Sequence, residues 1–328
     1  MGETGSGVPK EVCQVFTEAP GSVLLLGHVN PDGDQLGSLF GLGLALKEAG
    51  WRVTMAGPHP VPDPLRFLPG SALFEHWTAP RGPFDLIIVC DCPEPGRTVG
   101  LLEAARGPAS SVLGIDHHSD NKRYGDLNWV EPTASATGEM VYDLLESLGL
   151  KVTPEVATNL FTAILTDTGS FRYANATAKA FRTAAELVAR GVDPAQVAAR
   201  LYEARRPESL ALLGRVLQMI QVSPDGRIAW LALPSDSVPD AFLQGEDLVT
   251  YPRSIAGVKA AVFLREEAGQ RVKVSLRAKG EVPVNVIAQR FGGGGHANAA
   301  GCVLEGSLDE ATARIVSAIS EALEGAGR

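Results

Sequence analysis

Three side chains that can bind a metal ion occur within seven residues near the start of the chain. His28, Asp32 and Asp34 lie in the segment GHVNPDGDQLGS, directly after a short apolar run. Pro31 and Gly33 favour a tight turn that could aim both carboxylates inward. A turn in which Asp caps the following helix has the same composition, because Asp is common at helix N-caps. Alone, the segment indicates either a metal site or a capped helix.

Three later segments also place acids or histidines at the end of an apolar run. Asp91 ends the run in IIVCDCPEPGR, where a single Asp is more often a cap or a turn former. Asp116, His117 and His118 follow the run in GIDHHSDN, and adjacent histidines are hard to explain by packing because one must leave the apolar face. Asp167 ends a helical run in AILTDTGSFRY, where the negative end of the helix dipole disfavours an acid unless a cation is bound.

Together these segments offer imidazole nitrogens and carboxylate oxygens without a required thiolate. This donor set suits Mn²⁺ or Mg²⁺, and the nitrogen donors favour Mn²⁺. Two such ions that share one carboxylate can activate water beside a phosphoryl group. The residues therefore predict hydrolysis of a phosphoester by a pair of divalent metal ions.

A second group of residues, far along the chain, is suited to binding an anion. The segment FGGGGHANAAG contains four successive glycines, whose backbone could turn its N–H groups towards a phosphate or could be a flexible linker. Upstream, the spacing in VKVSLRAKG puts Lys273, Ser275, Arg277 and Lys279 on one face of a strand. A solvated edge strand would look similar, but the glycine run beside it favours anion binding.

Alternating short apolar runs and amphipathic stretches predict the elements that position the first group. Four runs read as strands buried on both faces, and a helix over residues 37–49 makes the first two a βαβ unit. Ligand sites in an open parallel sheet lie at the carboxyl ends of the strands, where three of the four metal-competent segments fall. The predicted strands are residues 23–26, 52–55, 86–90 and 111–115.

The rest of the chain reads as a helical stretch followed by a second α/β domain. We expect a catalytic domain over residues 1–204, a helical connector over 205–222 and a smaller domain over 223–328. The predicted helices of the middle stretch are residues 140–148, 154–165, 179–190, 194–203 and 207–219. The predicted elements of the last domain are strands over residues 227–233, 258–264 and 272–276 and helices over 284–291 and 308–323.

Composition excludes several classes of protein. Of 328 residues, 45% are hydrophobic and 20% are charged, which is too apolar for a disordered chain. The longest stretch without charged residues is glycine-rich and shorter than the roughly 20 apolar residues of a membrane span. No secretory signal is evident, so we expect a cytoplasmic protein with four reduced cysteines. A net charge of -9 disfavours binding along a long nucleic-acid duplex.

The four metal-competent segments, in this order, resemble the motifs of the DHH phosphoesterases, and FGGGGHANAAG resembles the DHH-associated C-terminal domain. The resemblance covers nearly the whole chain, and the short spacing between the domains is similar to that of the nanoRNase and pAp phosphatase branch. It implies an active site in a cleft between the two domains. A homodimer is compatible with it.

The resemblance also implies a role for each site residue. One ion would be bound by His28, Asp32 and Asp91, and the other by Asp34, Asp91, His117 and Asp167, with Asp91 as the bridge. His118 would orient a ligand or touch the scissile phosphate, and Asp116 would support the histidines. The residues that would grip the substrate's other phosphate are Ser275, Arg277, Gly293, Gly294, Gly295 and His296, with Arg172 beside the metal site.

The implied activity is hydrolysis of short RNA or DNA oligonucleotides to mononucleotides and removal of the 3′-phosphate of pAp. A cyclic di-AMP phosphodiesterase is a close alternative. An inorganic pyrophosphatase shares the metal motifs but not the glycine loop, and a nucleotide-binding module without catalysis is the remaining class. A RecJ-type exonuclease would need a longer chain and more basic surface.

Overall fold

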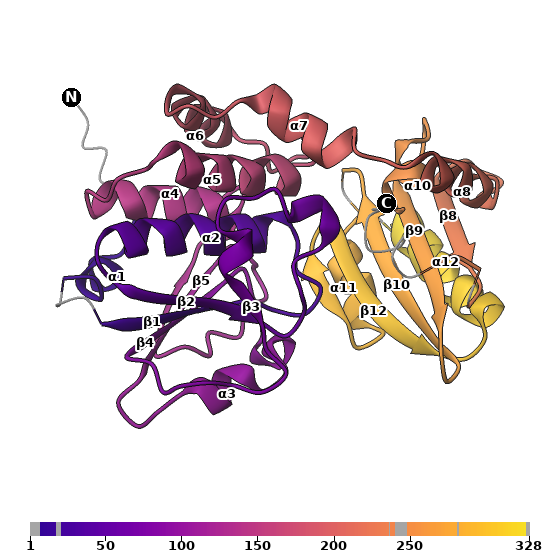
Figure 1. The fold of residues 1–328 in the computed structure, drawn as a ribbon. Coiled ribbons are helices and arrows are strands. Elements are labelled where there is room, and N and C mark those ends of the chain that lie inside the picture. The colour runs from indigo at the N-terminus through magenta and orange to yellow at the C-terminus, as the bar shows by residue number, and fades with distance from the viewer. Residues whose placement is uncertain (1–6, 18–20, 236, 240–247, 281, 326–328) are drawn as a thin grey trace. The chain divides into compact units, whose positions relative to one another are not determined.

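The computed structural model describes residues 7–17, 21–235, 237–239, 248–280 and 282–325. The chain divides into two compact units, Met1–Ala204 and Arg205–Arg328. Each unit is built around its own six-stranded sheet, as Figure 1 shows. Within the described residues, no helix combines the length and the apolar character needed to cross a bilayer.

The sheet of the first unit is entirely parallel, with strand order β3-β2-β1-β4-β5-β6. The four predicted strands are confirmed, and they form the centre of this sheet. The two edge strands were not predicted, because each is short and mostly half-buried and so lacks a continuous apolar run. The strands are β1 (Ser22–Leu26), β2 (Arg52–Gly57), β3 (Phe74–His76), β4 (Leu86–Cys90), β5 (Ser111–Asp116) and β6 (Leu127–Val130).

Helices cover both faces of this sheet, which is why its central strands are apolar throughout. One face packs on α2 (Gly33–Glu48), α4 (Thr137–Ser147) and α5 (Pro154–Asp167), and the other packs on α3 (Leu101–Ala105) (Figure 1). The remaining helices are α1 (Lys10–Gln14), α6 (Ala178–Ala189) and α7 (Pro194–Tyr202), and 3₁₀ turns occur at Asp63–Leu65, Ser71–Leu73 and Pro95–Thr98.

The predicted start of the first helix, residue 37, is wrong: α2 begins four residues earlier, at Gly33. Asp32 is the N-cap, and its Oδ1 accepts a hydrogen bond from the Gln35 backbone N–H at 3.0 Å. Glycine at position 37 then lets α2 lie close to α5, since a Cβ there would come within 2.5 Å of the Asn159 carbonyl oxygen. The early start places Asp34 in the first turn of α2 instead of in a loop.

The second unit has strand order β11-β12-β10-β9-β8-β7, antiparallel except for the parallel pair β8 and β9. Two helices pack on one face, α11 (Val284–Gln289) and α12 (Leu308–Gly325), and two on the other, α8 (Pro207–Leu217) and α10 (Thr250–Ser254). The strands are β7 (Ile220–Val222), β8 (Ile228–Leu233), β9 (Ala260–Glu267), β10 (Arg271–Ala278), β11 (Gly294–His296) and β12 (Ala299–Glu305).

Candidate metal centre

Four of the predicted site residues lie where neighbouring parallel strands end. His28 follows β1, Asp91 directly follows β4, Asp116 is the last residue of β5 and His117 follows it. These three strands are adjacent in the sheet, so the side chains share one edge. The topology therefore brings together segments that are far apart in the sequence.

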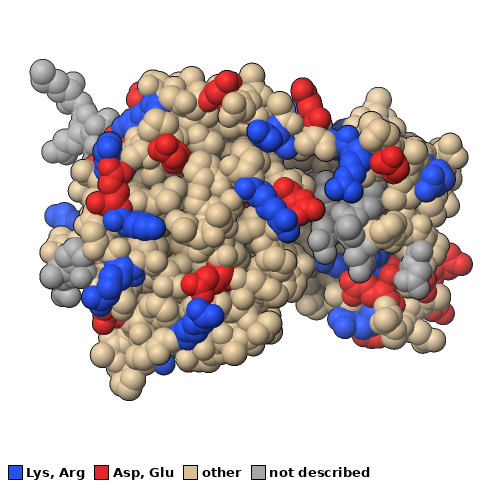
Figure 2. Space-filling view, viewed as in Figure 1, with Lys and Arg blue, Asp and Glu red and all other residues tan. Residues whose placement is uncertain are grey.

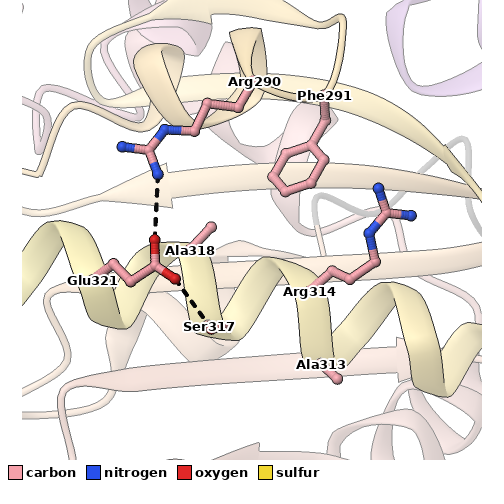
Figure 3. A pocket seen from close by; sticks show the side chains of 7 residues that line it. All are labelled: Arg290, Phe291, Ala313, Arg314, Ser317, Ala318 and Glu321. Carbon is pink, nitrogen blue, oxygen red and sulfur yellow. Dashed lines mark hydrogen bonds and ion pairs between the residues drawn. The ribbon is translucent and has the colours of Figure 1, made fainter.

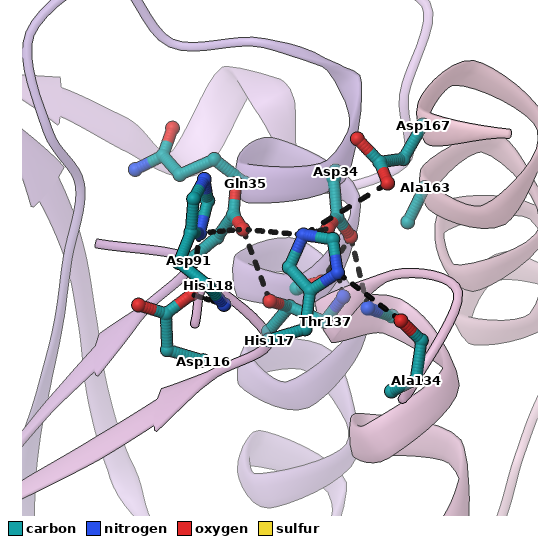
Figure 4. Close-up of polar contacts among 12 residues, drawn as sticks. Asp34, Gln35, Asp91, Asp116, His117, His118, Ala134, Thr137, Ala163 and Asp167 are labelled. Carbon is teal, nitrogen blue, oxygen red and sulfur yellow. Dashed lines mark hydrogen bonds and ion pairs between the residues drawn. The ribbon is translucent and has the colours of Figure 1, made fainter. Parts of the chain in front are cut away.

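Two helices supply further carboxylates to the same place. Asp34 lies in the first turn of α2, and Asp167 is the last residue of α5. The His117 Nε2 lies 3.6 Å from Asp34 Oδ2, 3.5 Å from Asp91 Oδ1 and 3.8 Å from Asp167 Oδ2. Figure 4 shows the ring of His117 with these three carboxylates around it.

The second imidazole, His28, presents a nitrogen that nothing in the described chain satisfies. Its Nδ1 lies 2.7 Å from the Val29 carbonyl oxygen and 3.1 Å from an Arg97 guanidinium nitrogen, and the tautomer that donates to Val29 has its lone pair on Nε2. Nε2 is buried, lies 4.0 Å from Asp91 Oδ2 and has no hydrogen-bond partner among the described residues. Buried polar atoms are rarely left without a partner, and a metal ion would supply one.

These residues form overlapping groups whose ligand atoms are mutually within 4.8 Å, a spacing suited to a metal ion. Asp91 belongs to a group with His28 and Asp32, whereas His117 belongs to one with Asp34 and Asp167. Asp91, His117 and His118 make a third. Asp32 thus caps α2 with one oxygen and also faces the cluster, so the two interpretations of its segment are compatible.

Asp91 has an unusual backbone conformation at the centre of the cluster. Its φ angle is 58°, in the left-handed region that residues other than glycine seldom occupy. The backbone N–H donates to the Ile115 carbonyl oxygen at 2.9 Å, which holds the turn against β5. Conformations of this kind cost about 1–3 kcal/mol and concentrate at functional sites.

The electrostatics of the cluster favour a bound cation. Burial raises the pKa of Asp34 to about 7, although His117 opposes the shift, and burial together with neighbouring acids raises the pKa of Asp91 well above its ordinary range. Burial, reinforced by the Arg97 guanidinium, lowers the pKa of His28 to about 4, so this imidazole is neutral at pH 7. A neutral imidazole and crowded carboxylates are the donors that a divalent cation binds.

Asp116 fixes the second histidine of the pair. Its Oδ1 accepts from the His118 backbone N–H at 3.1 Å and lies 2.7 Å from His118 Nδ1. Burial alone would lower the pKa of His118, but the Asp116 carboxylate raises it overall. His118 Nδ1 also lies 3.5 Å from Asp91 Oδ1, which places its ring at the margin of the cluster.

The sequence did not predict the role of residues 134–138, which contact the cluster directly. The Thr137 and Gly138 backbone N–H groups donate to Asp34 at 2.7 and 2.9 Å, and the Thr137 hydroxyl donates to Asp91 Oδ1 at 3.1 Å. The predicted start of this helix, residue 140, was wrong because α4 begins at Thr137. In the sequence, the one feature that could have indicated this role is the run of small and hydroxyl-bearing residues before an apolar stretch.

Arg172, the substrate residue predicted beside the metal site, is exposed, and its Nε donates to the Gly169 carbonyl oxygen at 2.6 Å. Within the described contacts it does not touch the cluster. Arg97, by contrast, has a guanidinium nitrogen 3.1 Å from His28 Nδ1.

The basic strand face predicted in the second unit is present on β10. Lys273 is exposed, Ser275 and Arg277 are half-buried, and these residues alternate with buried apolar ones. Arg277 donates from Nη1 to the Leu276 carbonyl oxygen at 3.1 Å. Lys279 lies just beyond the strand, and its Nζ donates to the Ile255 carbonyl oxygen at 3.2 Å.

The glycine run is more regular than the predicted loop. Gly294 and Gly295 form part of β11, paired with β12, and the helix before the run ends at Gln289, two residues earlier than predicted. Gly293 is packed so tightly that a Cβ would come within 2.6 Å of the Cys302 Cβ. His296 belongs to β11 by its backbone, and its side chain lies outside the described residues.

A separate pocket of about 580 Å³ lies on the second unit, beside α12 (Figure 3). An ion pair of 3.5 Å joins Arg290 to Glu321, and the Arg314 guanidinium lies over the Phe291 ring, 5.4 Å from its centre. None of the predicted substrate residues lines this pocket.

On the face of the first unit seen in Figure 2, acidic and basic side chains are interspersed, without a continuous basic stripe.

Two family models match the chain. Residues 22–165 match the N-terminal domain of the DHH family, and residues 246–325 match the DHHA1 domain. The first range carries all the candidate metal ligands except Asp167, which lies two residues beyond it.

Proteins similar to this chain over most of its length are known. It is 39% identical to the bifunctional oligoribonuclease and PAP phosphatase NrnA of Thermus thermophilus, over 96% of this chain and 94% of that protein. It is 31% identical to the protein of the same name from Bacillus subtilis, over 88% and 91% respectively. The structure of an exopolyphosphatase-related protein from Bacteroides fragilis is similar with a TM-score of 0.86 and 28% identity, covering 96% of this chain and 97% of that one.

Proposed function

This chain belongs to the DHH family of phosphoesterases, in the branch of the oligoribonuclease and PAP phosphatase NrnA, and we propose that it hydrolyses short oligoribonucleotides to mononucleotides and removes the 3′-phosphate of pAp. The observation that carries the proposal is the convergence of two imidazoles and four carboxylates at the carboxyl edge of one sheet. Similarity to NrnA over nearly the full chain supplies the substrate class.

The residues fit two divalent ions that share Asp91. One set would be His28, Asp32 and Asp91, supported by the unsatisfied Nε2 of His28. The other would be Asp34, His117 and Asp167 with Asp91, supported by the crowding of these acids around His117. Mn²⁺ is favoured over Mg²⁺ because the set includes imidazole nitrogen. Bound there, such ions polarise a phosphate group and make water more acidic.

The remaining residues would bind and orient the substrate. His118, fixed by Asp116, would contact a phosphate oxygen beside the metal ligands. In the second unit, the face of β10 that carries Ser275 and Arg277 would bind another phosphate, together with the glycines and His296. Accordingly, residues 1–204 would form the catalytic domain, 205–222 the connector and 223–328 the substrate-binding domain.

A parallel assay of four substrates tests this function. The substrates are pAp, a 5′-phosphorylated RNA dinucleotide, cyclic di-AMP and pyrophosphate, each with Mn²⁺ and with EDTA. We expect Mn²⁺-dependent hydrolysis of pAp and of the dinucleotide. Hydrolysis of cyclic di-AMP alone would indicate a cyclic di-AMP phosphodiesterase, and hydrolysis of pyrophosphate alone an inorganic pyrophosphatase. If none of the four substrates were hydrolysed, the result would contradict the proposal that the protein is an enzyme.

A further inference from the structure

Residues 134–138, with the sequence ASATG, contact or support every member of one ligand set. The Ala134 carbonyl oxygen lies 3.3 Å from His117 Nδ1, and the other ring nitrogen, Nε2, faces the acids. The Thr137 hydroxyl donates to Asp91, and the Thr137 and Gly138 N–H groups donate to Asp34. The Ser135 carbonyl oxygen reaches the fourth ligand through one intermediate side chain.

That intermediate side chain belongs to Asn175. Its Nδ2 lies 2.9 Å from the Ser135 carbonyl oxygen and 3.0 Å from Asp167 Oδ2. Asn175 therefore holds the Asp167 carboxylate in a fixed relation to residues 134–138. In Figure 4, dashed lines join His117 to Asp167 and to the Ala134 carbonyl oxygen.

The backbone contacts follow from the way α4 begins. The first N–H groups of a helix have no partner within the helix, and Ala136, at the N-cap, has no side-chain oxygen to bind them. Asp34 of α2 takes that role instead, so the start of one helix is capped by a candidate metal ligand of another. The Thr137 hydroxyl adds a bond that capping does not require, because it goes to a different carboxylate.

We propose that Thr137 and Asn175 are positioning residues that hold Asp91 and Asp167 in the arrangement needed by the ion set Asp34, Asp91, His117 and Asp167. The inference rests on the proposed metal site and adds two side chains that would not themselves touch the ion. Partners that orient metal ligands in this way change metal affinity or activity about 10–100-fold when removed. Thr137 contacts Asp91 through its side-chain hydroxyl and Asp34 through its backbone N–H. Removing the hydroxyl therefore leaves the backbone contacts to Asp34 in place.

Four substitutions separate this role from a general effect on folding. Thr137→Val removes the hydroxyl and keeps the branched shape, whereas Thr137→Ser keeps the hydroxyl. Thr162→Val is the matched control, because Thr162 is also fully buried but donates only to the Thr158 carbonyl oxygen within α5, at 2.8 Å. Asn175→Ala tests the second bond independently, should Thr137→Val fail to fold.

The measurement is calorimetric titration of chelator-treated protein with Mn²⁺, accompanied by kcat for pAp at increasing Mn²⁺. We expect Thr137→Val and Asn175→Ala each to weaken one of two binding steps by about 10–100-fold and to regain kcat in excess Mn²⁺. Thr137→Ser and Thr162→Val should bind Mn²⁺ like the wild-type protein.

The outcomes separate the inference from the function on which it rests. Wild-type affinity in both Thr137→Val and Asn175→Ala would overturn the positioning role and leave the metal site intact. An equal loss in Thr162→Val would also overturn it, because the effect would then belong to any buried threonine. A wild-type protein that binds no Mn²⁺ would contradict the metal site and the positioning role together.

Discussion

The carboxylate of Asp91 lies beside His117, with Oδ1 3.5 Å from the imidazole Nε2, although 26 positions separate the two residues in the sequence. Its other oxygen, Oδ2, is the one nearest His28 Nε2, at 4.0 Å. Each oxygen therefore faces a different imidazole, and Asp91 is shared by a group with His28 and Asp32 and a group with His117 and His118. The left-handed turn at Asp91 places the carboxylate between them.

Loss of Asp91 is expected to disable both metal positions at once. Asp91→Ala should lower kcat for pAp by more than about 100-fold at every Mn²⁺ concentration, because excess metal cannot replace a shared ligand. Asp85→Ala, which removes an exposed acid of the same unit, is the control and should retain activity. A rate close to that of the wild type in Asp91→Ala would refute the bridging role.

Loss of Arg277 is expected to weaken substrate binding. A hydrogen bond to a charged group contributes about 1.5–3 kcal/mol, so Arg277→Ala should raise KM for the RNA dinucleotide about 10–100-fold with little change in kcat. Arg271→Ala removes an exposed arginine at the other end of β10 and should leave KM unchanged. If KM were the same in both variants, this face of β10 would not bind the substrate phosphate.

Metal binding is expected to stabilise the folded chain. Burial and neighbouring acids disfavour the charged forms of Asp34 and Asp91 without a cation, and a ligand at 100 times its Kd adds about 2.7 kcal/mol to the free energy of unfolding. Scanning calorimetry of the chelator-treated protein should therefore show a higher Tm after Mn²⁺ is added. Asp91→Ala should lose most of that increase, and an equal increase in this variant would place the binding elsewhere.

Close packing of α2 on α5 is expected to depend on a missing side chain. Gly37→Ala would bring a Cβ within 2.5 Å of the Asn159 carbonyl oxygen, and overpacking of this kind costs about 1–3 kcal/mol. Gly214→Ala in α8 is the matched control, because a Cβ there meets nothing within 4 Å, and it should stabilise its helix. Urea unfolding measures the free energy of unfolding of both variants. If Gly37→Ala were as stable as the wild-type protein, the two helices could move apart at little cost.

The parts of the fold that could be predicted from the sequence are those with a continuous apolar pattern, and the parts that could not are those defined by tertiary contacts. The strands β1, β4 and β5 are continuous apolar runs, so their ends and the polar residues after them were identifiable. The start of α2 was predicted four residues late, because an Asp cap was only one of two interpretations of the segment and contact with α5 leaves no periodic signal. The short edge strands β3 and β6 were missed for a related reason, since pairing with a neighbour defines them more than apolar content does.

The role of residues 134–138 could not be predicted from residue types. Their contacts to Asp34 come from backbone N–H groups, which every residue except proline carries. The hydroxyl of Thr137 is an ordinary feature in a sequence and acquires a role only when the fold brings Asp91 to it. Metal ligands can be predicted from residue type and spacing, whereas the residues that orient those ligands become visible only in the tertiary structure.

The most direct test of the central claim is the rate of phosphate release from pAp by chelator-treated protein as Mn²⁺ is added back. The candidate metal centre predicts no measurable release without metal, and a rate that rises with Mn²⁺ and saturates when both ligand sets are filled. Release that continues at the same rate in EDTA would contradict a metal-dependent phosphoesterase at this site.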